Sequence, residues 1–232
     1  DGEIARALLS LRDRGVLAVV EPAGRIHIVT DSTSDLAPQD ARRLGIRIAS
    51  VSLVDGGEVL KDGVDPAPDG VYRRPAPDRN GPDTHPVTPG EFRELFESLV
   101  PTGDVLAVLC SSELSASCDH ARSAVAEGQD RLLELRRAAG SAAEPRIVVV
   151  DSRQCSGPLG MTAVFAARML AAGLGIDGVA RRVAEIGRRW RTLILVPGLE
   201  RLGRGLRSGA SAGGGAGDWW LPPYHQDGHL WR

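Results

Sequence analysis

Asp104–Cys110 reads DVLAVLC, an uninterrupted apolar run that leads directly into Ser111 and Ser112. A run this short with apolar residues on both faces predicts a strand buried on both sides, as in the interior of a parallel sheet. Two more segments share the pattern: Arg146–Val150 (RIVVV) and Arg191–Val196 (RTLILV). Strands of this kind need helices on both faces of the sheet to cover them.

The segments around these runs supply such helices. Phe92, Leu95, Phe96 and Leu99 stand at i, i+3, i+4 and i+7, which is the spacing of one helix face. The predicted helices are 38–44 (ended by Gly45), 89–100, 114–139 (an interruption at Gly128 being left open), 159–172 and 176–189. Two further strands are predicted at Arg25–Thr30 and Ile46–Val54. The alternation predicts an α/β fold with a parallel sheet and helices on both faces.

The rest of the chain is less regular. Residues 4–20 have mixed helical spacing and indicate an upstream helix or linker over 1–24. Residues 66–90 hold seven prolines and predict a long irregular loop. We expect an α/β domain over 25–200, of which 151–200 pack partly with a second domain. Residues 201–232, with a Gly-rich stretch at 203–217, would be the incomplete start of that second α/β domain.

Composition excludes several classes of protein. The 232 residues carry a formal net charge of −2, which gives no electrostatic basis for binding nucleic acid or an anionic membrane. No apolar run approaches the roughly 18–20 residues of a membrane-spanning helix, and the first 20 residues lack the pattern of a secretory signal. Three cysteines at unremarkable spacing indicate free thiols in a reducing compartment. We therefore expect a cytoplasmic protein.

Hydroxyl side chains follow three of the predicted strands: Asp31-Ser32-Thr33, Ser111-Ser112 and Asp151-Ser152. The carboxyl ends of parallel strands meet at one edge of a sheet, where ligands bind in open α/β folds. Each cluster precedes a predicted helix, whose first backbone amides are unpaired and favour an anion. A cradle for a carboxylate or phosphate is the functional interpretation. Helix capping is the alternative, and for each cluster taken alone it is favoured.

Signatures of catalysis or metal binding are weak. Gly209–Gly213 matches GxSxG but lacks the strand and helix that this motif requires. Cys118-Asp119-His120 and the pair His225 and His229 lack the further ligands that would complete a metal site. We therefore expect no cofactor and no metal. His27 is interpreted as a structural histidine, whereas His85 in the long loop could reach a ligand. A binding protein for a small anion fits this pattern better than an enzyme.

With these clusters identified, the chain resembles the DegV family. The resemblance is carried by six segments in order: Ile28–Leu36 (IVTDSTSDL, family IVTDSTADL), Leu60–Asp65 (LKDGVD, family Y-x-DGVD), Thr84–Phe92 (THPVTPGEF, family TSQPSPGEF), Ser111–Ser117 (SSELSAS, family SSxLSGT), Val150–Gly160 (VDSRQCSGPLG, family DS-x-x-x-SxGLG) and Leu199–Ser208 (LERLGRGLRS, family L-x-x-L-x-x-GGRI). The chain ends within the second domain that the resemblance implies, so we expect a truncated family member.

The resemblance implies two α/β domains with a long-chain fatty acid between them. Some members of the family serve as the acyl-carrying subunit of bacterial fatty acid kinase, whose separate catalytic subunit phosphorylates the carboxylate for phospholipid synthesis. Position by position, Thr84 and Ser115 would hydrogen-bond the carboxylate and Arg207 would supply positive charge. Ser152 and Ser156 are weaker candidates. On this basis we expect a lipid-binding protein without catalysis of its own, whose partner is a fatty acid kinase subunit.

The sequence departs from the family pattern at the proposed site. His85 replaces the serine of TSQP, Ala116 and Ser117 replace the glycine and threonine of LSGT, and Leu206 replaces the second glycine of GGRI. His85 could add a donor beside the carboxylate, and is included among the candidate ligand residues. Two alternatives stay open: an enzyme acting on a small carboxylated or phosphorylated metabolite with His85 as acid or base, and a nonfunctional remnant or interaction domain.

Overall fold

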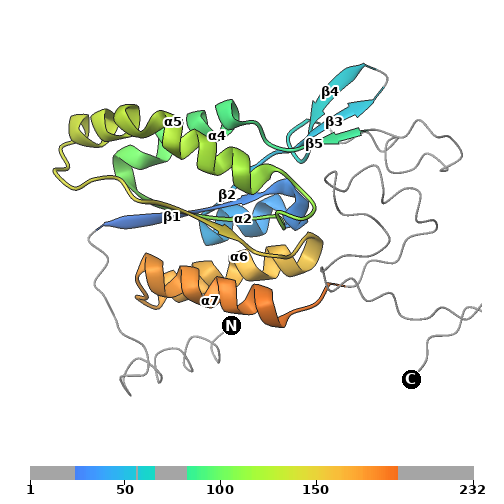
Figure 1. Cartoon of the computed structure of the whole chain (residues 1–232). Helices are drawn as coiled ribbons and strands as arrows, with labels where there is room; N and C mark the ends of the chain where they lie inside the picture. Colours follow the sequence, from blue (N-terminus) through green and yellow to red (C-terminus); the bar gives the residue numbers. More distant parts are fainter. Residues whose placement is uncertain (1–23, 56, 66–82, 193–232) are drawn as a thin grey trace, which may run out of the picture.

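The computed structural model describes residues 24–55, 57–65 and 83–192. These residues form seven strands, two 3-10 turns and five α-helices, labelled as in Figure 1. The strands are β1 (Arg25–Asp31), β2 (Ile46–Ala49), β3 (Ser52–Asp55), β4 (Glu58–Lys61), β5 (Asp83–His85), β6 (Gly103–Leu109) and β7 (Ile147–Asp151). The turns are η1 (Ser32–Ser34) and η2 (Val100–Thr102), and the helices are α2 (Pro38–Leu44), α4 (Pro89–Leu99), α5 (Ser117–Ala138), α6 (Ser156–Ala171) and α7 (Ile176–Arg189).

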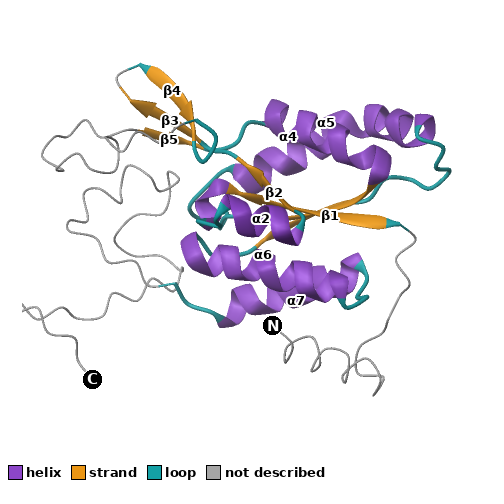
Figure 2. Ribbon diagram, turned by 180° about the vertical axis from the view of Figure 1, so that it is seen from behind, coloured by secondary structure: helices purple, strands orange, loops and turns teal. Residues whose placement is uncertain are grey.

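A four-stranded sheet in the order β2-β1-β6-β7 is the centre of the described part, and all of its strand pairs are parallel. Figures 1 and 2 show helices α4 and α5 on one face and α6 and α7 on the other. The predicted α/β architecture, a parallel sheet covered by helices on both faces, is therefore confirmed.

The apolar run of β6 explains this layering. Because successive side chains of a strand point to opposite faces, its residues divide between two cores. Leu106 and Val108 belong to the core under α2, α6 and α7, whereas Val105, Ala107 and Leu109 belong to the core under α4 and α5. All five are fully buried. A strand buried in this way has no polar face, which is why DVLAVLC shows no alternation.

A second sheet projects from one end of the first (Figure 1). It is antiparallel, has the order β4-β3-β5, and is called the small sheet below. The prediction of one strand over Ile46–Val54 was wrong: β2 ends at Ala49 in the parallel sheet, and β3 starts at Ser52 in the small sheet. The chain changes sheet at Val51, whose side chain is buried and whose N–H donates to Ser32 Oγ over 3.1 Å.

Other boundaries also differ from the predictions. The loop predicted over 66–90 contains strand β5, which its polar sequence Asp-Thr-His does not indicate. Helix α5 begins at Ser117 rather than Leu114, because Ser111 O accepts hydrogen bonds from the N–H groups of Leu114 and Ser115 and holds these residues in a turn. The helix runs through Gly128 without interruption.

Several predictions concern residues outside the described part. These are the upstream helix at 4–20, the Gly-rich stretch, the second domain over 201–232 and nearly all of the strand at Arg191–Val196; Arg191 and Thr192 themselves are not in a strand. Residues 151–192 pack against the parallel sheet, since α6 and α7 contribute to its core. Among the described helices, none has both the length and the apolar composition needed to cross a membrane.

Candidate functional site

Strands β1, β6 and β7 end side by side, because the parallel register pairs Val29 with Ala107 and Leu109 with Asp151. We call this the carboxyl edge of the sheet. Three motif segments of the sequence start here and contact one another. Asp31 Oδ2 accepts from Cys110 N over 2.9 Å, and Ser111 N donates to Gln154 O over 2.9 Å. The hydroxyl clusters predicted to meet at one edge are therefore brought together.

The Asp31 carboxylate is part of the framework of this edge. Its side chain is fully buried, and besides Cys110 N it accepts a hydrogen bond from the Thr33 hydroxyl. Burial raises the pKa of Asp31, although the hydrogen bonds from Thr33 and Cys110 oppose this effect. A buried carboxylate whose oxygens are occupied by neighbouring donors ties β1 to β6 and is not available to a ligand.

Asp151 fixes the other side of the edge. Its Oδ2 accepts from Ser112 Oγ over 2.6 Å, and its Oδ1 accepts from the backbone N–H groups of Ser112 and Arg153 at 3.3 and 2.8 Å. Arg153 itself has a positive φ of 55°. The Asp151 carboxylate therefore organises the two loops that follow β6 and β7.

Ser152 lies beneath the surface of the site. It is fully buried, donates from Oγ to Gln154 O over 3.2 Å and accepts from Gln154 N over 3.1 Å. Helix α7 approaches this loop closely at Gly187, where a Cβ would stand 2.4 Å from Ser152 O. The hydroxyl of Ser152 is thus engaged with the backbone of its own loop.

Ser156 is exposed at the start of α6, and its hydroxyl donates to Asp35 Oδ2. Both residues have positive φ values, 54° for Ser156 and 51° for Asp35. The pair joins the opening motif to the VDSRQCSGPLG motif. The same two segments meet at Gly160, where a Cβ would stand 2.5 Å from Ser34 O.

Ser115 lies half-buried just before α5. Its Oγ is 3.0 Å from Ser117 Oγ and accepts from Ser117 N over 3.2 Å. The N-cap residues of α5 and α6 are Ala116 and Cys155, neither of which caps through its side chain. The capping interpretation of the Ser111-Ser112 and Asp151-Ser152 clusters is therefore wrong, because their hydroxyls bond within and between the loops instead.

Thr84 and His85 lie on β5 of the small sheet, where both side chains are exposed. Thr84 is paired with Leu53 and His85 with Ser52 of β3. The side chain of Lys61 on β4 donates to Ser52 Oγ over 2.7 Å and also contacts the Glu91 carboxylate.

Glu91 completes a capping box at the start of α4, in which Thr88 Oγ1 accepts from Glu91 N and the Glu91 carboxylate accepts from Thr88 N. Burial alone would raise the pKa of Glu91, but hydrogen bonds from Lys61 and Thr88 outweigh it, and the net pKa is lowered. Lys61 and Glu91 belong to the LKDGVD and THPVTPGEF motifs. Their ion pair therefore joins two motif segments that the sequence leaves apart.

The Thr84–Phe92 segment also contacts α5. His120 Nδ1 is 2.8 Å from Val87 O, and Val87 is buried. Sequence spacing could not indicate this contact, because the two residues are 33 positions apart. Arg207 lies outside the described residues. Thr84 and Ser115 are thus carried by different elements, one on the small sheet and one before α5.

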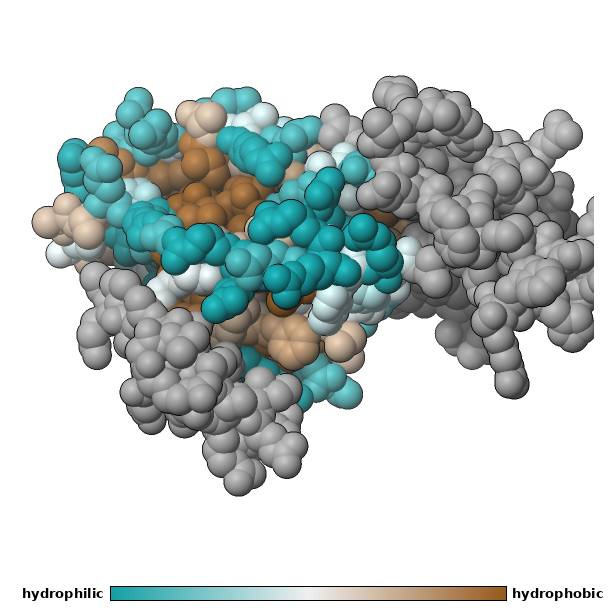
Figure 3. Space-filling model, turned by 60° about the horizontal axis from the view of Figure 1, so that its bottom comes forward, coloured by the Kyte–Doolittle hydropathy of each residue, from teal (hydrophilic) through white to brown (hydrophobic). Residues whose placement is uncertain are grey.

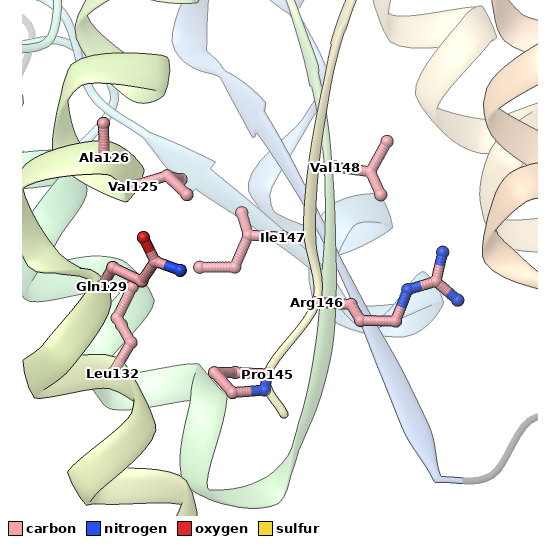
Figure 4. A pocket seen from close by; sticks show the side chains of 8 residues that line it. All are labelled: Val125, Ala126, Gln129, Leu132, Pro145, Arg146, Ile147 and Val148. Carbon is pink, nitrogen blue, oxygen red and sulfur yellow. The ribbon is translucent and has the colours of Figure 1, made fainter. Parts of the chain in front are cut away.

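Two cavities of the described part are lined by helices on opposite faces of the parallel sheet. One of about 350 Å³ lies between α5 and the start of β7 (Figure 4), where Ile147 points toward Gln129 and Arg146 toward the opposite side. Another of about 390 Å³ lies between α6 and α7, with Phe165 and Trp190 among its lining residues. Figure 3 brings the side with α6 and α7 forward and shows apolar surface beside hydrophilic side chains.

The described residues contain no group of three His, Cys, Asp or Glu side chains that could hold a metal ion. His27 is buried and its Nε2 is 2.9 Å from Thr102 Oγ1, which is the structural role predicted for it. The three cysteines are free thiols, and burial raises the pKa of Cys110 and of Cys118 to about 12. Burial also raises the pKa of Cys155, so none of the three is a ready nucleophile.

Comparison with known proteins gives the same family as the motifs. A profile described as "Uncharacterised protein, DegV family" matches residues 25–213. A DegV domain-containing protein of Mycobacterium bovis is 33% identical over 193 residues, covering 81% of this chain and 61% of the relative. One from Listeria monocytogenes is 29% identical over 193 residues, covering 81% of this chain and 62% of the relative. The chain thus spans about three fifths of the length of these relatives.

Solved structures share the fold. A DegV family protein from Thermus thermophilus, described by its fatty acid binding, has 28% sequence identity and a TM-score of 0.58, with 71% of this chain and 54% of that chain covered. A stearic acid-binding protein from Eubacterium ventriosum has 25% identity and a TM-score of 0.58, with 68% and 52% covered.

Proposed function

Because this chain belongs to the DegV family, we propose that it binds a long-chain fatty acid and holds the carboxylate at the carboxyl edge of the sheet. The observation that carries the proposal is the convergence of the hydroxyl motifs at that edge in a fold shared with fatty-acid-binding relatives. The fatty acid itself is inferred from those relatives. The residues proposed to hold the carboxylate come from the family resemblance, and the hydroxyl side chains that meet at this edge support them.

Ser115 is the donor best placed for this role. Its Oγ already accepts from Ser117 N, and Ser117 is fully buried with its own hydroxyl 3.0 Å away. When Ser117 donates to Ser115, the proton of Ser115 is left for a ligand oxygen. The first amides of α5, a helix of 22 residues, lie beside it and favour a negative charge.

Thr84 and Arg207 complete the proposed carboxylate site. Thr84 would donate from the small sheet, and Arg207 would supply the cationic partner. Hydrogen bonds to a charged group contribute about 1.5–3 kcal/mol each. His85, the next residue of β5, and Ser156, at the start of α6, are further candidate ligand residues, and Ser152 would support the loop from beneath.

We further propose that the chain acts as a cytoplasmic acyl carrier and that chemistry at the carboxylate is performed by a separate fatty acid kinase subunit. This proposal comes from the family resemblance. Burial raises the pKa of the Cys110 and Cys118 thiols, which disfavours their thiolate forms.

The test is a titration of oleate into the purified chain and into the double variant Ser115→Ala with Arg207→Ala. Loss of two charge-assisted hydrogen bonds predicts a dissociation constant raised by more than about 100-fold. The control is Ser98→Ala, since Ser98 is an exposed serine of α4 whose hydroxyl bonds only its own helix, at Leu95 O. An unchanged affinity in the double variant would overturn the proposed carboxylate site.

A further inference from the structure

His120 on α5 makes a hydrogen bond whose direction is fixed by chemistry. Its Nδ1 is 2.8 Å from the carbonyl oxygen of Val87, and a carbonyl oxygen can only accept. Nδ1 therefore carries a hydrogen and donates it, whether the ring is neutral or protonated. His120 lies in the first turns of α5, where its own N–H donates to Ala116 O over 2.9 Å.

This bond connects the two elements that carry the proposed donors. Val87 follows Thr84 by three residues, and His120 follows Ser115 by five. The side chain of Val87 is buried in the core under α4 and α5, so its carbonyl is a fixed point of the segment. A contact at this position sets how far the β5 segment stands from the start of α5.

Such a contact matters more here than in the central sheet. All three residues of β5 are exposed, so little apolar burial fixes its place. The place of β5 therefore depends on the segment that follows it, which is held by the buried Val87 side chain and by polar contacts. One of them, between Lys61 and Glu91, holds β4 to α4; the bond from His120 holds the loop between β5 and α4 to α5.

We propose that His120 is a positioning residue, which holds the Thr84 segment against the start of α5 so that the Thr84 and Ser115 hydroxyls reach one carboxylate. The inference rests on the proposed function. It goes beyond the family resemblance, because His120 lies outside the six motif segments and they assign it no role. The histidine acts through the Val87 carbonyl and not by touching the fatty acid.

The test distinguishes the roles of the two ring nitrogens of His120, Nδ1 and Nε2. In His120→Asn the side-chain amide can stand where Nδ1 stands, whereas in His120→Gln it can stand where Nε2 stands. If the bond to Val87 O is what counts, His120→Ala and His120→Gln weaken oleate binding by about 3- to 10-fold, the range for loss of one hydrogen bond, and His120→Asn restores it to within about twofold. Arg131→Ala, at an exposed position further along α5, is the matched control.

Stability is measured on the same variants, by urea unfolding. A merely structural histidine would change the unfolding midpoint of His120→Ala while leaving the oleate dissociation constant of the folded protein unchanged, and this result would overturn the proposal. Binding that His120→Gln preserves and His120→Asn loses would also overturn it, because Nε2 would then be the active nitrogen. A wild-type chain that binds no oleate refutes the proposed function first, which keeps the two failures distinct.

Discussion

The parallel sheet and the small sheet hold their places by different means. In the parallel sheet, the strand β6 is fully buried from Val105 to Leu109 and lies between two apolar cores. In the small sheet, Val59 is 61% exposed and all of β5 is exposed. Packing therefore fixes the first sheet. In the second, the ion pair between Lys61 and Glu91 ties β4 to α4, and the segment that follows β5 is held by the buried Val87 side chain and by the hydrogen bond from His120.

This difference bears on the proposed site, because each sheet presents part of it. Ser115 belongs to the turn that follows the rigid strand β6, and Thr84 belongs to the small sheet. A carboxylate bound between Ser115 and Thr84 would stabilise the small sheet, because a ligand that binds only the folded arrangement shifts the equilibrium toward that arrangement. Variants that weaken one sheet at a time test whether packing stabilises the parallel sheet more than the small sheet.

We expect the largest difference between the two sheets when a buried apolar side chain is shortened, measured as the loss in free energy of unfolding. Leu106→Ala deletes a fully buried side chain from the central strand and should lower the free energy of unfolding by about 2–5 kcal/mol. Val59→Ala in the small sheet should change it by less than about 0.5 kcal/mol. Urea denaturation followed by circular dichroism measures both. Equal losses in the two variants would contradict a stability centred on the parallel sheet.

The next effect concerns the loop beneath the site. Gly187→Ala places a Cβ 2.4 Å from Ser152 O, so α7 or the loop has to move, and we expect a loss of about 1–3 kcal/mol in unfolding free energy. Gly178→Ala is the matched control in the same helix, because its Cβ meets open space. That control should be neutral or stabilising by up to about 1 kcal/mol. If both variants lose unfolding free energy, the cause is a general effect of alanine in helix α7 and not the close approach of Gly187 to Ser152.

The smallest effect is expected from the polar support of the small sheet. Lys61→Met removes the ion pair with Glu91, in which both side chains are 33% exposed, and screening by solvent limits the loss to about 0.5–1 kcal/mol. Hydrogen exchange of the β3 amides should accelerate accordingly while exchange in β6 stays unchanged. Arg43→Met removes an exposed ion pair on α2 and serves as the control. Faster exchange in β6 would show that the two regions are not independent.

The same pair predicts a dependence on pH. The pKa of Glu91 is lowered in the folded chain, so its contribution is present above the ordinary pKa of a glutamate and is lost as pH falls through the lowered value. Wild type and Lys61→Met should therefore differ in unfolding free energy at pH 7, and the difference should shrink as pH falls through the lowered pKa of Glu91. A difference in unfolding free energy that stays the same at every pH would mean that the Glu91 carboxylate does not contribute through its charge.

The same division governs how far sequence reasoning could go. The apolar runs of β6 and β7 predict the parallel sheet because burial on both faces leaves a composition signal, and the meeting of the hydroxyl clusters follows from parallel topology. The split between Ala49 and Ser52 leaves no such signal, because β-rich residues continue through it. The residues of β5, Asp-Thr-His, are typical of a loop. They form a strand because they pair with β3, and this pairing cannot be predicted from the residues of β5 alone.

Long-range polar contacts were likewise beyond prediction. Lys61 and Glu91 are 30 positions apart, and His120 and Val87 are 33 apart, so no periodicity relates them. The resemblance marked the segments that hold Lys61 and Glu91 but gave no reason for them, and the ion pair supplies one. The candidate ligand residues Thr84, His85, Ser115, Ser152, Ser156 and Arg207 stay predictions until a ligand is bound.

Mass spectrometry of the purified chain, first under native conditions and then after organic extraction, tests the central claim most directly. The account predicts one long-chain fatty acid per chain, released by extraction and identified by its mass. A folded chain that carries no lipid, and takes up none when incubated with oleate, would contradict the proposed function.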